Sequence, residues 1–401
     1  MSIRKLASVL LLIPILTLGS SFIVVGTQDL EDTPNSLFNK TLMRWGSRSQ
    51  PPLITSNSEG DIIVVGATVN ADLQMVDSWQ KTSKGGLETF ILKLNAMGEL
   101  VWSTYFGGSK SDYVKALETG SDGSIVIAGH TSSADLILGT GQRLTTADLF
   151  DFDEDLFVSR IEKNGTISST AVFGGNLSEI IMSVTIDQDL NAVVFGQSYS
   201  PDFPSGQNST LGAGFFLTKV GRDGSILEIS KPSAFDDMYL FSSAYLNDHE
   251  LVTVGSANFE EVLLTVIHIN GTSLWSNSVN HGSDSLNVDS VFIDDGQRIV
   301  IVGSIYNESS QTAYNDYEGS YFYPDADEFI ECFSSNGTRL WRNAIAGSSE
   351  DYGNFVIAGP SGEILLFGET YSSDFPNSWS NLSVYHGEGD ISIGFHGPDG
   401  F

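Results

Sequence analysis

Cysteine is almost absent from this chain. Cys332 is the only one among 401 residues, so no intrachain disulfide can form. It lies in the apolar stretch 329–333 at strand spacing, which predicts a small buried hydrophobic side chain. Nothing near it in the sequence would lower the pKa of the thiol, and this disfavours a reactive cysteine.

Positive charge is also scarce. Lysine and arginine number 19 against 50 aspartates and glutamates, giving a formal net charge of −31. A surface of that sign repels the phosphate backbone, so nucleic acid is excluded as a partner. The simplest explanation of the negative charge is solubility in a salty or crowded medium outside the cell. Cation binding or display at a cell surface is the more specific alternative.

Helical periodicity and familiar catalytic motifs are missing as well. No long apolar pattern of period 3.6 follows the N-terminus, so we expect little helix. None of the six histidines stands at metal-ligand spacing, and no Gly-x-Ser-x-Gly elbow occurs. The paired glycines precede no helix that could bind phosphate. Nucleophilic and nucleotide chemistry are therefore unsupported, and no cofactor is expected apart from calcium, discussed below.

What the chain does have is one phrase repeated six times: an apolar, β-branched run closed by glycine and usually followed by Thr or Ser. The copies are 62–68, 125–131, 192–198, 251–256, 299–304 and 364–370. They recur roughly every sixty residues, a period at which neighbouring units must stack to bury their faces.

Three further strands accompany each glycine strand. One precedes it, as in 113–117, and a hairpin follows it, as in 89–94 and 100–108. Four strands per repeat predict a blade of a β-propeller. The sixth copy stops at Phe401 without a last strand, while 41–46 resembles a fourth strand without a blade. We therefore predict an all-β, six-bladed propeller of four-stranded antiparallel blades, closed by an N-terminal strand that completes the last blade.

The phrases resemble the bacterial and archaeal β-propeller repeat family called the SBBP, or seven-bladed β-propeller, repeat, over residues 40–401. Gly368-Glu-Thr-Tyr-Ser-Ser-Asp374-Phe-Pro376 and Trp102-Ser-Thr-Tyr-Phe-Gly107-Gly108 are close to the family's phrases. The fourth and fifth repeats lack the Asp-Phe-Pro element. The family name implies seven blades, which stays open beside the six counted. The resemblance implies a propeller outside the cell and supplies no catalytic residues.

The N-terminus is typical of an export signal. Arg4 and Lys5 precede an apolar run from Leu6 to Leu18, and the small residues 19–21 offer a cleavage site. Taken through Gly26 the run is long enough to span a bilayer, so a cleaved signal and a retained anchor are both open, with the anchor favoured. The predicted domains are a signal peptide or anchor at 1–28, a linker at 29–40 and the propeller at 41–401. The body is expected outside the cell, secreted or anchored through this segment alone.

Eight Asn-x-Ser/Thr sequons agree with that location: Asn39, Asn164, Asn176, Asn208, Asn270, Asn307, Asn336 and Asn381. Three of them are Asn-Gly-Thr at one repeat position, and Asn-Gly is the favoured two-residue hairpin turn. We interpret the turn as the cause of the repetition and glycosylation as an addition.

Carboxylates recur too. Asp72, Asp135, Asp202 and Asp374 share one loop position, and a residue that repeats in every unit is expected to make turns rather than to catalyse. The densest acidic cluster is 148–155. Because hard carboxylate oxygens suit Ca²⁺, Asp151, Asp153 and Asp155 are candidate calcium ligands, although the loop lacks the glycine and distal Glu of an EF-hand.

Aromatic residues divide into two groups. Trp45, Trp102, Trp275 and Trp341 share a fourth-strand position and are expected to pack between blades, while Trp79 and Trp379 lie in polar loops. The long loop of the fifth repeat is rich in tyrosine. A sugar- or protein-binding face and a small core within the loop are both open interpretations. The candidate ligand-binding residues there are Tyr314, Tyr317, Tyr321 and Tyr323.

The predicted function is a non-enzymatic binding, adhesion or scaffold module that recognises an extracellular protein or glycan. The alternative is a hydrolase or lyase acting on extracellular polysaccharide, with carboxylates near the channel of the propeller. Candidates for that role are Asp112, Glu179, Asp289 and Asp351, and the sequence does not choose among them. A purely structural role in a surface coat is the third interpretation.

Overall fold

The structure is a computed structural model of the whole chain. It describes residues 13–17, 20–24, 43–44, 53–57, 59–68, 75–95, 98–136, 139–145, 154–206, 209–232, 238–247, 249–257, 261–269, 271–279, 285–294, 296–306, 326–345, 347–358, 364–372 and 390–396. The chain divides into two compact units, residues 1–232 and residues 233–401.

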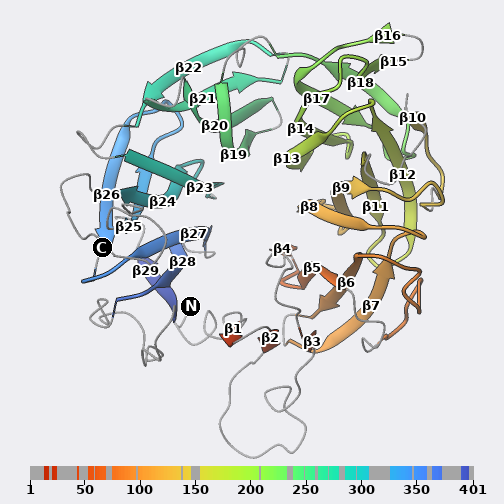
Figure 1. Ribbon diagram of the computed structural model, residues 1–401, viewed down its shortest axis with the longest axis horizontal. Coiled ribbons are helices and arrows are strands. Elements are labelled where there is room, and N and C mark those ends of the chain that lie inside the picture. The colour runs from red at the N-terminus through yellow and green to blue at the C-terminus, as the bar shows by residue number, and fades with distance from the viewer. Residues whose placement is uncertain are drawn as a thin grey trace, which may run out of the picture. The chain divides into compact units, whose positions relative to one another are not determined.

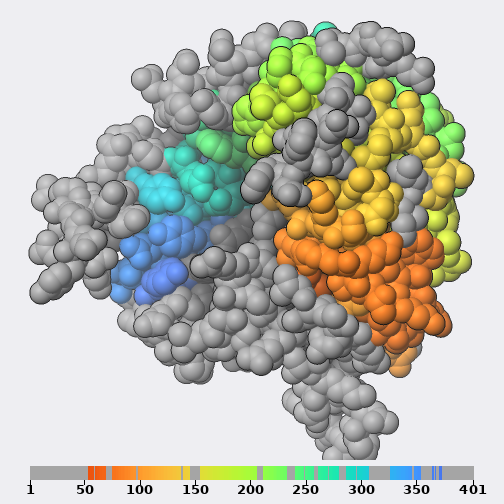
Figure 2. Space-filling model, turned by 45° about the vertical axis from the view of Figure 1, so that its right-hand side comes forward, coloured from red at the N-terminus to blue at the C-terminus, as the bar shows by residue number. Residues whose placement is uncertain are grey.

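Unit 1 contains three antiparallel blades, and each begins with a strand on the concave side of the unit (Figure 1). Blade 1 has β4 (Leu53–Ser56), β5 (Ile62–Thr68), β6 (Glu88–Leu94) and β7 (Leu100–Phe106). Blade 2 has β8 (Asp112–Thr119), β9 (Ile125–Thr131), β11 (Asp155–Ile161) and β12 (Ile167–Gly174), and β10 (Arg143–Thr145) is added parallel to β12. Blade 3 has β13 (Glu179–Ile186), β14 (Ala192–Ser198), β17 (Gly214–Val220) and β18 (Ile226–Ser230), with the small hairpin β15 (Pro204–Gly206) and β16 (Ser209–Thr210) beside it. The blades appear as successive orange, yellow and green bands in Figure 2.

Unit 2 contains two four-stranded blades and a three-stranded sheet. Blade 4 has β19 (Met238–Asn247), β20 (Glu250–Ala257), β21 (Glu261–His268) and β22 (Ser273–Ser278). Blade 5 has β23 (Ser285–Ile293), β24 (Ile299–Tyr306), β25 (Ala326–Phe333) and β26 (Arg339–Ile345). The last sheet has β27 (Asp351–Ala358), β28 (Ile364–Thr370) and β29 (Asp390–His396).

The predicted all-β propeller fold is confirmed, but the number of complete blades is five rather than six in the described residues. The predicted closure is also wrong there. The N-terminal strand is β3 (Met43–Arg44), and it pairs with β2 (Ser20–Val24), which in turn pairs with β1 (Ile13–Thr17), while β29 has β28 as its described neighbour. Pairing with a strand close by in the chain costs less loop-closure entropy than pairing with the far terminus.

The described residues contain no helix, as predicted, and therefore none of the length and apolar character needed to cross a membrane. Strands β1 and β2 lie within the segment that the sequence assigns to an export signal or anchor.

The repeated glycine has a geometrical cause. In blades 2 to 5 the first strand carries a β-bulge opposite the glycine. In blade 2 the register shifts between Val114 and Ala116, and Val114 pairs with Gly129. A Cβ on Gly129 would lie 2.1 Å from the carbonyl oxygen of Tyr113. The bulge brings backbone against backbone, so only glycine fits there.

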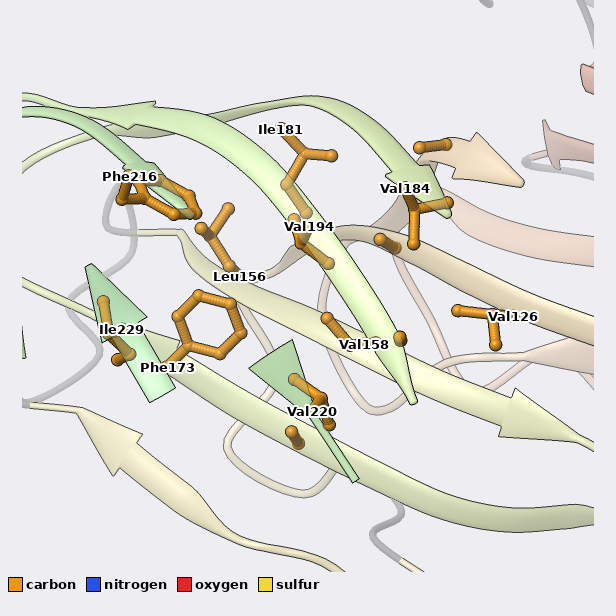
Figure 3. Close-up of a cluster of buried hydrophobic side chains, with 14 of the residues drawn as sticks. Val126, Leu156, Val158, Phe173, Ile181, Val184, Val194, Phe216, Val220 and Ile229 are labelled. Carbon is orange, nitrogen blue, oxygen red and sulfur yellow. The ribbon is translucent and has the colours of Figure 1, made fainter. Parts of the chain in front are cut away.

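The cores of the blades lie between neighbouring sheets. Between blades 2 and 3, Val158 and Phe173 of one sheet meet Val194 and Phe216 of the next (Figure 3). Glycine strands are buried along their length, as in β9, because a sheet stacked on both faces is apolar on both. Each large side chain buried in this way stabilises the fold by about 1.5–3 kcal/mol.

The fourth-strand tryptophan of blade 1 packs against the Asn-Gly turn of blade 2. Trp102 is buried, its Nε1 donates to the carbonyl oxygen of Lys163 at 3.1 Å, and a Cβ on Gly165 would lie 3.0 Å from its ring. Gly165 has φ +86°, which suits the turn. Trp102 therefore packs between blades as predicted. Cys332 is also buried as predicted, and burial raises its pKa to about 11.

Candidate functional site

Three of the four carboxylates weighed for catalysis occupy one repeated position at the start of the first strand. Asp112 of β8 is fully buried and accepts hydrogen bonds from Thr131 Oγ1, from Ser133 Oγ at 2.8 Å and from Gly108 N at 2.7 Å. Burial raises the pKa of this carboxyl, and these hydrogen bonds oppose the rise. The contacts join the first strand to the end of the glycine strand.

Glu179 and Asp351 repeat the arrangement. Glu179 accepts hydrogen bonds from Ser198 Oγ at 2.8 Å and from Ser200 Oγ, and Asp351 accepts them from Thr370 Oγ1 and from Ser372 Oγ at 2.9 Å. All three carboxylates are buried. Side chains that are enclosed and repeated in this way hold the blade together, and we assign no chemistry to them.

The loop aspartates also act structurally. Asp135 Oδ1 accepts hydrogen bonds from both N and Oγ of Ser109 at 2.8 Å, which lowers the pKa of Asp135. Asp202 Oδ1 accepts one from Asn176 N at 3.0 Å. Both contacts tie the loop of one blade to the next.

Asp289 differs from these carboxylates in position and in surroundings. In five of the six sheets that contain a glycine strand, a first-strand bulge places one residue outside the regular pairing: Lys115 and Met182 in unit 1, and Phe241, Asp289 and Asn354 in unit 2. We call these the first-strand bulge residues. They share a position but no chemistry, and β-bulges are frequent next to active sites, where they re-aim a side chain.

The carboxyl of Asp289 keeps contact with solvent, although protein displaces much of the water around it. This desolvation raises its pKa to about 6, and a hydrogen bond from Asn287 Nδ2 at 2.9 Å opposes the rise. Burial raises the pKa of the Tyr306 phenol, and the charge of the nearby Asp289 adds to the rise. A carboxylic acid that is accessible and still protonated near pH 6 is suited to general acid catalysis.

An exposed aromatic ring occupies the equivalent bulge of the neighbouring blade. Phe241 of β19 is 37% exposed, and β19 packs against β23. Val291 N donates to Ser242 Oγ at 3.2 Å across the two strands, one residue from the bulge residue of β19 and two from that of β23. Unit 2 therefore presents an acid and an aromatic surface on adjacent first strands.

Unit 1 holds a second group of titratable side chains, on blade 2. Tyr113 donates from its hydroxyl to Glu154 Oε2, and its ring stacks on His130 with centroids 5.0 Å apart. Lys115 Nζ lies 5.4 Å from the centre of the Tyr113 ring. Burial lowers the pKa of Lys115, whereas burial and Glu154 raise that of Tyr113.

His130 is the most enclosed member of this group. It is 4% exposed, neither ring nitrogen has a hydrogen-bond partner among the described residues, and Nδ1 lies 3.7 Å from Glu154 Oε2. Burial lowers its pKa to about 4, with a smaller effect from Lys115, so the ring is neutral at neutral pH. The sequence pattern does not reveal this group, because its members come together only through strand pairing.

The candidate calcium loop is described only at its end. Asp151 and Asp153 lie outside the described residues. Asp155 is buried, and its Oδ2 lies 3.4 Å from Arg143 Nη1. No group of three His, Cys, Asp or Glu side chains that could hold a metal ion occurs in the described part of the chain.

The other predicted sites are only partly described. Tyr314, Tyr317, Tyr321 and Tyr323 lie outside the described residues, as do the sequons Asn39, Asn208, Asn270, Asn307 and Asn381. Asn164, Asn176 and Asn336 are exposed. Asn164 and Asn336 each accept a hydrogen bond at 3.1 Å from the backbone N two residues on, as turn-forming asparagines do.

No family model matches the chain, and no curated protein matches it. Similar solved structures include a protein of unknown function from Dyadobacter fermentans, with 10% identity, a TM-score of 0.47 and coverage of 86% of this chain and 94% of that one. A Hadza microbial sialidase has 9% identity and a TM-score of 0.43, covering 80% and 63%. The polysaccharide lyase Uly1 has 12% identity and a TM-score of 0.40, covering 72% and 59%.

Two of these three proteins are named as enzymes. That finding contradicts the prediction that the chain is not an enzyme, and the prediction is corrected. At these TM-scores the likenesses assign no activity to this chain. Any activity has to be argued from its own residues.

Proposed function

We propose that the protein is an extracellular hydrolase acting on a neutral glycan, with Asp289 as its general acid. The observation that carries the proposal is the combination found at Asp289: access to solvent, a raised pKa of about 6, and a bulge position at which no other sheet carries a carboxylate. Glycosidic bonds are cleaved with the help of a carboxyl group kept protonated by its surroundings.

In the proposed reaction, Asp289 protonates the glycosidic oxygen of the leaving group. As the bond from the anomeric carbon to that oxygen breaks, the carboxyl gives up its proton and water supplies the hydroxyl of the new reducing end. The proton released by the water restores the acid. Such a group contributes about 10²–10⁴-fold to the rate.

Two observations favour a neutral sugar chain. The formal charge of −31 repels anionic polysaccharides over a distance. The exposed face of Phe241, on the strand beside Asp289, offers the apolar surface on which a sugar ring stacks. A location of the protein outside the cell and a signal or anchor in residues 1–28 are predictions from the sequence, and both are part of the proposal.

The test measures new reducing ends released from a panel of neutral and anionic polysaccharides. The wild type is compared with Asp289→Asn and with Asp223→Asn, which makes the same change at an exposed turn aspartate. We expect release from a neutral member, a loss of about 100-fold or more in Asp289→Asn and none in Asp223→Asn. Equal rates for all three proteins would overturn the proposal.

A further inference from the structure

The fourth strand of every complete blade carries a β-bulge of its own, and the bulged residue is exposed and aliphatic in four of the five blades. Val101, Leu227, Leu274 and Leu340 are 40%, 54%, 48% and 50% exposed. The register shifts at each of these positions, and at Ser168 in blade 2. In these four blades an exposed apolar side chain therefore lies on the outermost strand of the sheet.

In blades 1 and 2 the chain covers this edge itself. In blade 1, Ser103 N donates to Val76 O at 2.9 Å and Tyr105 N donates to Gln80 O at 3.1 Å. In blade 2, Thr170 N donates to Thr140 O at 3.0 Å and Val172 N to Gln142 O at 2.9 Å, and β10 continues the cover. Both covering segments belong to the connection between the second and third strands of the blade.

In blade 4 that connection is too short to do the same. It consists of 258–260, between the end of β20 and the start of β21. Aligned through the tryptophan position, Ser276 and Ser278 of β22 correspond to Ser103 and Tyr105 of blade 1. No described residue accepts a hydrogen bond from the outward amide of Ser276 or Ser278.

Charge separates β22 from β18 and β26, and cover separates it from β7 and β12. The uncharged β7 and β12 are covered by their own chain. Among the described residues nothing pairs with the outer edge of β18 or β26. β18 carries the exposed Glu228, and β26 carries Arg339 and Arg342, charges that discourage the addition of another strand. β22 has the sequence Ser-Leu-Trp-Ser-Asn-Ser, with no charge and no cover in the described residues.

We propose that β22 is an interface between two copies of this chain, formed by antiparallel pairing of β22 with β22. A twofold pairing of one uncharged strand with itself brings no like charges together, which matters for two molecules of charge −31. The outward amides and carbonyls of Ser276 and Ser278 bond across the axis, and Leu274 of each copy loses contact with water. This interface is independent of the proposed hydrolase activity.

The experiment is sedimentation equilibrium of the full chain. We expect a monomer–dimer equilibrium in the micromolar range that tightens as salt screens the net charge. Ser278→Pro removes an outward amide without removing a bond to β21, and Leu274→Glu adds charge to the edge; each is expected to weaken the dimer at least tenfold. The matched controls on β26, Ala344→Pro and Leu340→Glu, are expected to leave it unchanged.

Circular dichroism establishes that each variant is folded. A wild type that stays monomeric at high micromolar concentration and high salt overturns the proposal. A dimer that the β22 variants leave intact, or that the β26 variants weaken to the same extent, overturns it too.

Discussion

Val291 donates its backbone N–H to Ser242 Oγ at 3.2 Å, and this contact fixes β23 beside β19 one residue away from the bulge of β19. Asp289 and Phe241, the bulge residues of two separate repeats, therefore lie on adjacent first strands. The proposed site uses both residues, one as the acid and one as an apolar surface.

The raised pKa of Asp289 has a consequence for stability. In the folded protein the carboxyl keeps its proton up to about pH 6, whereas in the unfolded chain it loses it near 3.8. Its contribution to the free energy of unfolding is therefore present below pH 3.8 and is lost as the pH rises towards 6. We expect Asp289→Asn to melt at a higher temperature than the wild type at pH 7.5 and at the same temperature at pH 4. A variant that is less stable at pH 7.5 would contradict the desolvation of Asp289.

Burial of His130 predicts the opposite pH dependence. The unfolded chain binds a proton at this residue near pH 6.5, and the folded protein only at about pH 4. Stability is constant above pH 6.5 and falls by up to about 3 kcal/mol as the pH falls from 6.5 to 4. Urea unfolding of His130→Gln is expected to show a smaller loss over that window. His249→Gln, at an exposed histidine, is the control, and an unchanged pH slope in His130→Gln would argue against a neutral buried ring.

The first-strand carboxylates predict a stability effect without an effect on catalysis. Thr131→Val leaves the buried Asp112 carboxyl short of one hydrogen bond, which is expected to cost about 1.5–3 kcal/mol. Thr82→Val changes an exposed threonine in the same way and is expected to cost almost nothing. Denaturant titration checks both. Unchanged stability in Thr131→Val would show that the bond is not formed.

The glycine strand gives a sharper test of packing. Gly129→Ala drives a Cβ into the carbonyl of Tyr113, which must move and open the bulge. Gly296→Ala is the comparison, because its nearest neighbour would be Asp294 Oδ1 at 3.2 Å and its φ is not positive. We expect a fall in melting temperature several times larger for Gly129→Ala. Equal falls would mean that the first-strand bulge can relax.

Much of this fold could be read from the sequence, since the apolar run closed by glycine gives both the strand and the repeat. The reason for the glycine could not be predicted from the sequence, because the bulge opposite Gly129 appears only when two strands are paired. The same limit applies to the site. Asp112, Glu179, Asp289 and Asp351 look alike in the sequence, and only pairing shows that Asp289 occupies a bulge while the others are enclosed by Ser and Thr hydroxyls. Counting blades failed for a related reason: a strand-like pattern at 41–46 does not say with which neighbour it pairs.

The most direct test of the proposed activity is the pH dependence of glycan hydrolysis by the wild type and by Asp289→Asn, followed as reducing ends released from a neutral polysaccharide. If Asp289 is the general acid, kcat/KM of the wild type falls above about pH 6, and Asp289→Asn loses both the activity and that limb of the profile. A wild type whose rate stays flat from pH 5 to 8, or a variant that keeps the same alkaline limb, would contradict the account.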